Sequence, residues 1–269
     1  MPELPEVETT LRAIQSFDQD TLDSVTIHNP SLRWLVDPEI HQKLAGKKVT
    51  QIFRRAKYII FDFADYQLII HLGMSGTLRI MGKNENYFKK HDHAELVFNK
   101  NKLIYNDPRR FGSIHITDSY LEHFLIASLG PEPLSSDFST NYLFKKIKNS
   151  NTNIKNFIMN QKNVVGIGNI YASEILFKSY VDPRRITKSI TKKECGLITK
   201  NSKEVLKEAI KVGGTTLKDF FSAEGSAGYF KIQLAAYDRE NEECTRCKNL
   251  INKITQNQRA TYFCKVCQN

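Results

Sequence analysis

Two pairs of cysteines in the last part of this 269-residue chain constrain its fold more than any other feature. Cys244 and Cys247 are separated by two residues, Cys264 and Cys267 repeat that spacing, and 16 residues lie between the pairs. Two such pairs are typical of a zinc ribbon, in which four thiolates complete a tetrahedral site and leave no coordination position open. We therefore expect one structural Zn²⁺ per chain on a β-hairpin, rather than four unpaired surface thiols.

The remaining sequence has the character of an intracellular globular protein. Cys195 lies in an amphipathic helical pattern and is expected in a core, and the clustering of the other cysteines argues for a reducing compartment. The residues after Met1 lack the features of a secretory signal, and no apolar run approaches the length of a membrane span. With 41% hydrophobic and 25% charged residues, the composition excludes a disordered chain. We expect a cytoplasmic protein with no membrane partner.

The net positive charge of the chain comes entirely from its second half. Residues 1–130 carry 16 basic and 16 acidic side chains, whereas residues 131–269 carry 23 and 13, which accounts for the whole formal net charge of +10. A basic half joined to a neutral half is typical of a protein that binds a polyanion such as nucleic acid. A basic protein that is merely soluble has the same overall charge, so charge alone leaves both interpretations open.

The hydrophobic pattern predicts an α+β multidomain protein. Apolar residues at positions 7, 11, 14 and 17 predict a first helix, and short β-rich runs from Val25 to about Thr117 are typical of a sandwich or barrel. A Gly-Pro-Glu-Pro segment at 130–133 then breaks the pattern. Helices are expected near 139–149, 153–160, 169–179 and 191–212. The predicted domains are a β-sandwich with flanking helices (1–130), a helical domain (131–234) and the zinc ribbon (235–269).

Two further features could contact an anion. Val165-Gly-Ile-Gly-Asn169 is a tight turn between two predicted helices, in a helix-turn-helix-like arrangement that would present helix N–H groups. The alternative is a packing turn with Asn169 as the helix N-cap. Arg259 lies at the expected tip of the zinc hairpin, where it could reach a phosphate or simply be solvated.

The amino terminus offers an unusual nucleophile. Removal of Met1 would expose the secondary amine of Pro2, with the carboxylate of Glu3 beside it. A terminal amine has a much lower pKa than a lysine, so far more of it is neutral and nucleophilic near pH 7. A secondary amine that attacks an acetal carbon forms a cationic iminium, which can accept electrons during an elimination. The alternative is that Pro2 and Glu3 only begin a helix.

The order of several motifs resembles the bacterial formamidopyrimidine-DNA glycosylases, which are 8-oxoguanine DNA glycosylase/lyases. The matching segments run from residue 1 to residue 267. They are the opening Met1-Pro-Glu-Leu-Pro-Glu-Val-Glu-Thr9, Arg54-Arg-Ala-Lys57-Tyr58, His71-Leu-Gly-Met-Ser-Gly76, His91-Asp-His93, Asp107-Pro-Arg-Arg-Phe-Gly112, Val164 to Glu174, Gly213-Gly-Thr-Thr-Leu217, Gly228-Tyr-Phe230 and Gln258 to Cys264. The resemblance implies that the helical domain is a helix-two-turn-helix unit with a lesion loop.

The resemblance also implies a chemistry. Pro2 would attack C1′ of the damaged nucleotide, and Glu3 would act as the acid that helps to open the sugar and expel the base. Lys57 and Arg259 would contact phosphates and assist β,δ-elimination. The target base must leave the helix to reach Pro2.

The remaining implied roles concern the DNA. Met74, Arg109 and Phe111 would fill the vacated space, with Phe111 as a wedge and Arg109 facing the orphan cytosine. Asn169 would hold a phosphate, and the loop from about 222 to 230 would close over the flipped base. Further DNA contacts are expected at His91, Ser150 and Lys155, and pocket residues at Glu6 and Tyr229. Ser150 stands where a lysine is common, so Lys148 is an alternative contact.

Several alternatives remain open at this point. The sister class, endonuclease VIII-like enzymes, acts on oxidised pyrimidines and shares the Pro-Glu start and the zinc finger. A chain that retained Met1 would only bind damaged DNA, because its Pro2 nitrogen would be an amide. The segment at 107–111 could also be an ordinary turn with Phe111 in the core. The expected partner is damaged double-stranded DNA, bound by a monomer.

Overall fold

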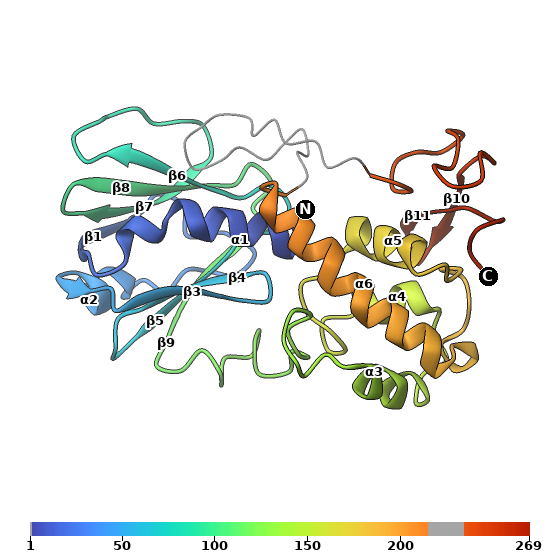
Figure 1. The fold of residues 1–269 in the computed structure, drawn as a ribbon. Coiled ribbons are helices and arrows are strands. Elements are labelled where there is room, and N and C mark those ends of the chain that lie inside the picture. The colour runs from blue at the N-terminus through green and yellow to red at the C-terminus, as the bar shows by residue number, and fades with distance from the viewer. Residues whose placement is uncertain (1, 215–233) are drawn as a thin grey trace. The chain divides into compact units, whose positions relative to one another are not determined.

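The computed structural model describes residues 2–214 and 234–269 and divides into two compact units (Figure 1). The first unit contains residues 2–127 with Gly213 and Gly214, and the second contains residues 128–212 with 234–269. None of the helices in these ranges has the length and apolar character needed to cross a bilayer.

The first unit is a β-sandwich with helices at its flank, as the sequence predicts. One antiparallel sheet has the strand order β2-β1-β7-β8-β6 and the other has the order β3-β4-β5-β9. The elements are α1 (Leu4–Ala13), η1 (Gln15–Phe17), β1 (Thr21–Ile27), α2 (Ile40–Leu44), β2 (Lys47–Lys48), β3 (Gln51–Arg55), β4 (Tyr58–Asp62), β5 (Gln67–His71), β6 (Thr77–Gly82), β7 (Asp92–Phe98), β8 (Asn101–Asn106) and β9 (Ser113–Thr117).

One hydrophobic core joins α1 to both sheets. The predicted stripe of Val7, Leu11, Ile14 and Phe17 is buried there, against strand residues such as Ile59 and Phe98. The core therefore holds the ends of the strands in fixed positions. The loops that follow β5 and β8 start from these fixed ends. These two loops carry all three predicted gap-filling residues, Met74, Arg109 and Phe111.

The second unit begins with a helical part. Its helices are α3 (Thr140–Ile147), α4 (Ile154–Met159), α5 (Asn169–Lys178) and α6 (Lys192–Lys211), with a short 3₁₀ turn, η2 (Thr187–Ser189). These bounds agree with the predicted helices to within two residues. Thr191 and Glu194 form the reciprocal capping box that starts α6. The N-cap of α5 is Gly168 rather than Asn169, because Asn169 is already the first helical residue.

The zinc hairpin completes the second unit. Strands β10 (Asn252–Gln256) and β11 (Arg259–Phe263) pair in register through a two-residue turn of Asn257 and Gln258. Both turn residues have positive φ, at 45° and 61°, which matches the right-handed twist of a tight hairpin. Arg259 follows this turn directly and is exposed, so the expectation of an arginine at the hairpin tip is confirmed.

Candidate active site and nucleic-acid interface

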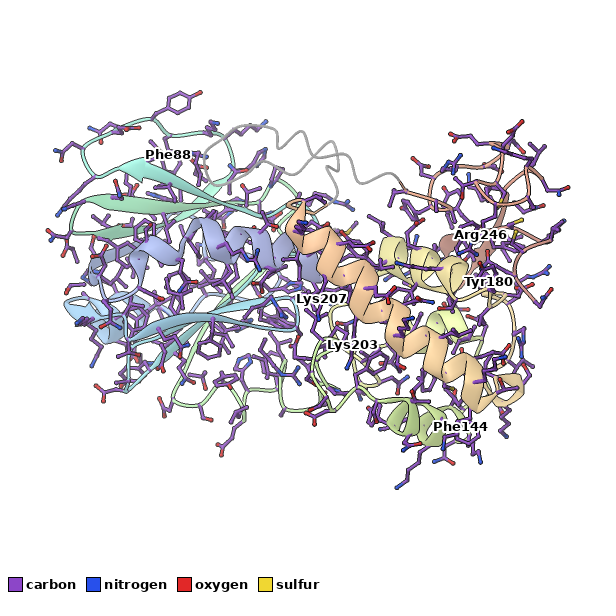
Figure 2. All side chains as sticks on the ribbon, viewed as in Figure 1. Phe88, Phe144, Tyr180, Lys203, Lys207 and Arg246 are labelled. Carbon is purple, nitrogen blue, oxygen red and sulfur yellow. The ribbon has the colours of Figure 1, made fainter. Side chains whose placement is uncertain are left out.

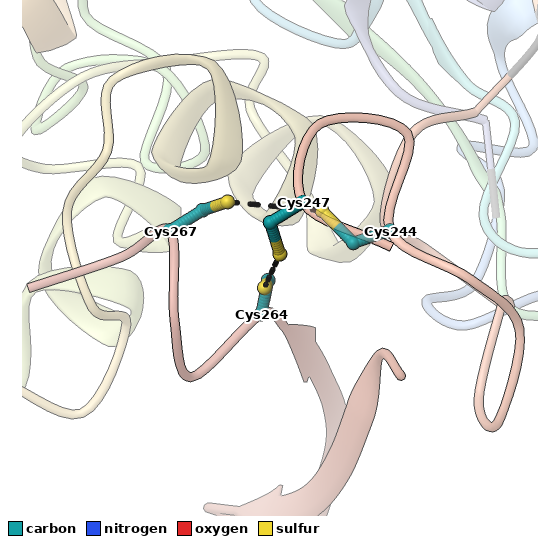
Figure 3. A group of neighbouring side chains, drawn as sticks. All are labelled: Cys244, Cys247, Cys264 and Cys267. Atoms are coloured by element: carbon teal, nitrogen blue, oxygen red, sulfur yellow. Dashed lines mark hydrogen bonds between the residues drawn. The ribbon is translucent and has the colours of Figure 1, made fainter. Parts of the chain in front are cut away.

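The four ribbon cysteines converge on one point (Figure 3). Their sulfur atoms all lie within 4.8 Å of one another, with Cys244 Sγ 3.8 Å from Cys267 Sγ and Cys247 Sγ 3.4 Å from Cys264 Sγ. A tetrahedral zinc with Zn–S bonds of about 2.3 Å places its sulfurs about 3.8 Å apart. The cluster fits a single structural Zn²⁺, and the alternative of four separate surface thiols is wrong.

Lys155 joins the helical part of this unit to the ribbon. Its side chain is fully buried, and Nζ donates to Asn169 Oδ1 at 2.6 Å, to the Ala260 carbonyl at 2.8 Å and to Thr261 Oγ1 at 2.7 Å. The ammonium is therefore surrounded by protein acceptors inside the second unit. The sequence led us to expect a DNA contact at Lys155, whereas the structure places it against Asn169 and against Ala260, the residue that follows Arg259.

The same contact orients Asn169. Because the amide oxygen of Asn169 accepts from Lys155, its amide NH₂ group is the part left to donate elsewhere. Asn169 also lies in the first turn of α5, where helix N–H groups and the helix dipole favour an anion. The arrangement suits a phosphate oxygen, although the predicted N-cap role belongs to Gly168.

Ser150 and Lys148 have different surroundings. Ser150 lies in a turn, where its Oγ accepts from the Thr152 N–H and its carbonyl accepts from Thr187 Oγ1 at 2.6 Å. Lys148 is exposed and stacks its ammonium 4.3 Å from the ring centroid of Phe144. Ser150 therefore makes hydrogen bonds within the fold, whereas Lys148 is an exposed cation, as are Lys145 and Lys146 before it.

The amino terminus is held tightly at the start of α1. Pro2 is buried, and Glu3 and Glu6 form a capping box in which the Glu3 N–H donates to Glu6 Oε2 at 2.9 Å. Both carboxylates are almost completely buried. The helix start therefore fixes Pro2 and its neighbouring acid in one place. Met1 and Tyr229 lie outside the described residues, as does the loop at 222–230.

Lys57 and His71 lie on neighbouring strand ends of the same unit. Lys57 is in the β3–β4 turn, and His71 is the last residue of β5, paired with Tyr58. Burial, with Lys57 and Arg33 as further causes, lowers the pKa of His71 to about 4. His71 Nδ1 accepts from the Gly73 N–H at 3.2 Å, which a neutral ring allows. Sequence reasoning assigned no role to His71, and its burial beside a lysine is visible only in three dimensions.

The three predicted gap-filling residues lie on exposed loops. Met74 is 37% exposed and Phe111 is 44% exposed, and the guanidinium of Arg109 lies 4.8 Å from the Phe111 ring centroid. Phe111 is therefore not a core residue, and that alternative is wrong. His91, another predicted contact residue, is half-buried and has a positive φ of 73°. It lies immediately before β7, whose pairing with β8 is bulged between Asp92 and Ala94.

A β-sandwich that begins with Pro-Glu, a helix-two-turn-helix unit and a Cys₄ ribbon together define a zinc-containing DNA glycosylase with lyase chemistry. Comparison with known families gives the particular one: the chain belongs to the formamidopyrimidine-DNA glycosylases. The N-terminal domain of that family matches residues 1–114, its H2TH domain matches 129–221, and the zinc finger found in FPG and IleRS matches 241–269.

Individual relatives agree over the full length. The formamidopyrimidine-DNA glycosylase of Hydrogenovibrio crunogenus is 49% identical, with 100% of this chain and 96% of the relative covered. That of Neisseria meningitidis is 42% identical, with both chains fully covered. The LlFpg protein in a complex with THF-DNA and an inhibitor superimposes with a TM-score of 0.91 at 35% identity over all of both chains. Lactococcus lactis Fpg with DNA containing N7-benzyl-Fapy-dG gives 0.89 at 33% identity over 99% of each. The protein is a DNA-binding repair glycosylase/AP lyase with one structural zinc.

Proposed function

We propose that this chain removes oxidised purines, 8-oxoguanine and formamidopyrimidines, from duplex DNA through a Schiff base at Pro2. The observation that carries the proposal is the capped amino terminus, where Pro2 and Glu3 are buried together at the start of α1. Family membership supports the chemistry, and solved Lactococcus lactis Fpg complexes with DNA containing N7-benzyl-Fapy-dG or Fapy-dG support the substrate class.

The proposed reaction uses groups of this chain in sequence. The Pro2 nitrogen bonds to C1′ as the bond between C1′ and the damaged base breaks, and the base leaves with the proton that the amine gives up. The C1′–O4′ bond then breaks as O4′ takes a proton from Glu3 and the nitrogen lone pair forms the second C1′–N bond. The resulting iminium is cationic, so loss of a C2′ proton expels the 3′ phosphate, and a second elimination expels the 5′ phosphate. Hydrolysis of the iminium then frees Pro2. Glu6 would shape the pocket by holding the Glu3 backbone, together with Tyr229.

The proposed DNA contacts divide into two kinds. Lys57, His91, Asn169 and Arg259 would contact the DNA backbone. Lys148 is favoured over Ser150 because it is an exposed cation, whereas Ser150 makes hydrogen bonds within the fold. Met74, Arg109 and Phe111 would fill the gap left by the base. Lys155 would act indirectly, by orienting Asn169 and supporting the strand that begins with Arg259.

We further propose a domain division at 1–130, 131–234 and 235–269, a monomeric state and a cytoplasmic, nucleoid-associated location. The ranges of the three matched family domains support the division. Bacterial repair enzymes among the relatives support the location.

The covalent step is tested by borohydride trapping. With an 8-oxoguanine duplex, we expect an adduct whose crosslinked peptide begins at Pro2, and a Pro2→Gly protein should lose most of it. Pro5→Ala is the matched control, because it removes the other proline of the same turn and keeps the amine. An undiminished adduct in Pro2→Gly that maps to Lys57 would show that the nucleophile is misassigned.

A second candidate substrate class has specific support. Lactococcus lactis Fpg has also been solved with DNA containing an oxidised pyrimidine, and it matches this chain with a TM-score of 0.90. Single-turnover excision from matched duplexes with 8-oxoguanine or thymine glycol would separate the two classes. We expect faster release of the purine, and the reverse order would favour the endonuclease VIII-like alternative.

A further inference from the structure

The residues proposed to fill the gap come from two separate segments of the first unit. Met74 belongs to the loop after β5, whereas Arg109 and Phe111 belong to the loop after β8. If they are to enter the base stack as one body, something must fix the two loops to each other before DNA arrives. A single buried side chain, Asp107, contacts both.

The carboxylate of Asp107 is surrounded by donors. It is fully buried, Oδ1 accepts from Ser75 Oγ at 2.6 Å, and Oδ2 accepts from the Gly112 N–H at 2.8 Å. The Tyr105 hydroxyl lies 3.2 Å from the same Oδ2. Burying a carboxylate is costly unless hydrogen bonds replace its water, and bonds to an ionised acceptor are the strong ones. Ser75 stands next to Met74 and Gly112 next to Phe111, so the carboxylate links the two loops directly.

Backbone hydrogen bonds also hold the loop after β8, which contains Arg109. The Arg109 N–H donates to Ser75 Oγ at 3.3 Å, and the Arg110 N–H donates to the Asp107 carbonyl at 3.1 Å. The Asp107 N–H in turn donates to the His91 carbonyl at 3.1 Å. Arg110 has a positive φ of 54°, which turns the chain sharply between Arg109 and Phe111.

Two glycines allow the loops to touch without a spacer. A Cβ on Gly73 would lie 2.3 Å from the Gly112 nitrogen, and a Cβ on Gly112 would lie 1.9 Å from the Tyr105 hydroxyl. Gly73 also has a φ of +62°, which a residue with a side chain rarely adopts. The two backbones are therefore in direct contact at the point where the Asp107 carboxylate bonds to both loops.

We propose that Asp107 is a positioning residue that holds Met74, Arg109 and Phe111 as one preformed insertion unit. The inference rests on the proposed gap-filling role of those three side chains. A loop that is already in its DNA-bound arrangement does not lose conformational entropy when it enters the stack, so more of its contact energy supports base extrusion. Asp107 itself would touch neither the DNA nor the reacting atoms.

The test compares two activities in each variant. Asp107→Asn keeps the shape but places an NH₂ group against one of the donors, and Ser75→Ala removes the hydroxyl that joins the two loops, at a half-buried position. We expect excision of 8-oxoguanine under single turnover to fall about tenfold or more in both, since each loses a hydrogen bond to a charged group. Lyase activity on a preformed abasic site should fall much less. Ser75→Thr restores the hydroxyl and should restore excision, and Ser119→Ala is the matched control.

The outcomes separate this inference from the proposed function. If Phe111→Ala loses excision while Ser75→Ala and Asp107→Asn keep it, the gap-filling role stands and the positioning role of Asp107 is wrong. If Phe111→Ala keeps full excision, the gap-filling role fails and the inference fails with it. In a double variant the effects of Ser75→Ala and Asp107→Asn on excision should be less than additive, because both changes weaken the same Ser75–Asp107 bond. Parallel loss of both activities with a fall in melting temperature would also overturn the inference.

Discussion

Phe111 illustrates how a single residue can be kept available for a partner. Its ring is 44% exposed, and the Arg109 guanidinium stacks on it at 4.8 Å. An aromatic ring on a base stack is worth about 1–3 kcal/mol, which is similar to the cost of extruding a base. Phosphate contacts add affinity without favouring the extruded state. The stacking energy of the Phe111 ring can therefore decide whether the base is extruded.

We therefore expect Phe111→Ala to keep a near-normal melting temperature and to lose excision on lesion duplexes. Because a preformed abasic site needs no base extrusion, the variant should retain more of its lyase activity. Thermal melts and the ratio of the two activities provide the measurement. A fall of about 3–5 kcal/mol in the free energy of unfolding, with the ratio unchanged, is what a core phenylalanine would give.

His71 makes the first unit sensitive to acid. Burial and the nearby Lys57 lower its pKa to about 4 in the folded state, against an ordinary value of 6.5. Between these values the unfolded chain binds a proton that the folded chain does not, so the free energy of unfolding falls as the pH falls from 6.5 to 4.

The corresponding prediction uses a difference between two proteins. His71→Asn keeps an acceptor for the Gly73 N–H and removes the titrating ring. Its free energy of unfolding, measured in urea at pH 7 and pH 5, should change less with pH than that of the wild type, by roughly 1–3 kcal/mol. Subtraction cancels any loss of zinc common to both proteins. Equal pH dependence would show that His71 titrates normally.

At the residue scale, the sequence was most informative where the chemistry is carried by residue type and spacing. Four cysteines at ribbon spacing predicted the metal cluster, and Pro2 followed by Glu3 suggested the nucleophile and the acid of the proposed reaction. Asp107 and His71 could not be found in this way, because their importance comes from burial and from partners on other strands. For Lys155 the expected contact was with DNA, and its three acceptors inside the fold could not be anticipated from a single lysine in a helix.

At the scale of elements, the ribbon depends on a bound zinc ion and on packing against α5. Its small core consists of a few residues such as Ile251 and Tyr262, and it includes Phe177 from α5. Structural zinc binding and ribbon folding are coupled, because the site does not exist in the unfolded chain.

Loss of the metal should therefore unfold the ribbon and leave the β-sandwich of the first unit folded. We expect Cys247→Ser to lose zinc, displace Arg259 and lose DNA affinity, while hydrogen exchange in β3, β4 and β5 stays as in the wild type. Cys195→Ala is the control, since that cysteine lies in α6 apart from the cluster. Full DNA affinity in a zinc-free protein would contradict the prediction.

Local elements were predictable to a useful degree, and their pairing was not. Capping residues and apolar periodicity located the helices of the second unit, including α6 with its Thr191–Glu194 box. The sandwich was expected from its short strands, yet the order β2-β1-β7-β8-β6 pairs strands far apart in sequence. Such pairing depends on which faces bury together, and no local pattern contains that information.

At the scale of the whole molecule, the net charge is divided unequally between the two structural units. The formal charges of the first unit sum to zero, and the second unit carries the whole excess of +10. Attraction to the DNA backbone is therefore concentrated on the unit with the helix-two-turn-helix and ribbon, whereas the unit with Pro2 contributes little net charge. Binding through phosphates releases counterions, so affinity should depend steeply on salt.

Salt titrations can measure how many such contacts each variant makes. The slope of log K against log salt changes by about 0.9 for each phosphate contact on duplex DNA. Arg259→Ala should therefore flatten the slope by about one unit. Lys83→Ala, which removes a lysine paired with Asp23 on the sandwich, should leave it unchanged. Identical slopes for Arg259→Ala and the wild type would argue that Arg259 is only solvated.

The contacts between the ribbon and the neighbouring helices limit which segments of this protein could be exchanged with those of another protein. Arg246, which lies between Cys244 and Cys247, has its guanidinium 3.9 Å from the ring centroid of Tyr180 (Figure 2). The same group lies 4.3 Å from the ring centroid of Phe177 and donates to the Phe177 carbonyl at 2.8 Å. Glu174 accepts three backbone N–H groups from 235–237. A chimaera that received residues 235–269 alone would leave these partners behind, together with Lys155. A transplantable module would have to include α4 and α5, so the helices and the finger are exchanged together or not at all.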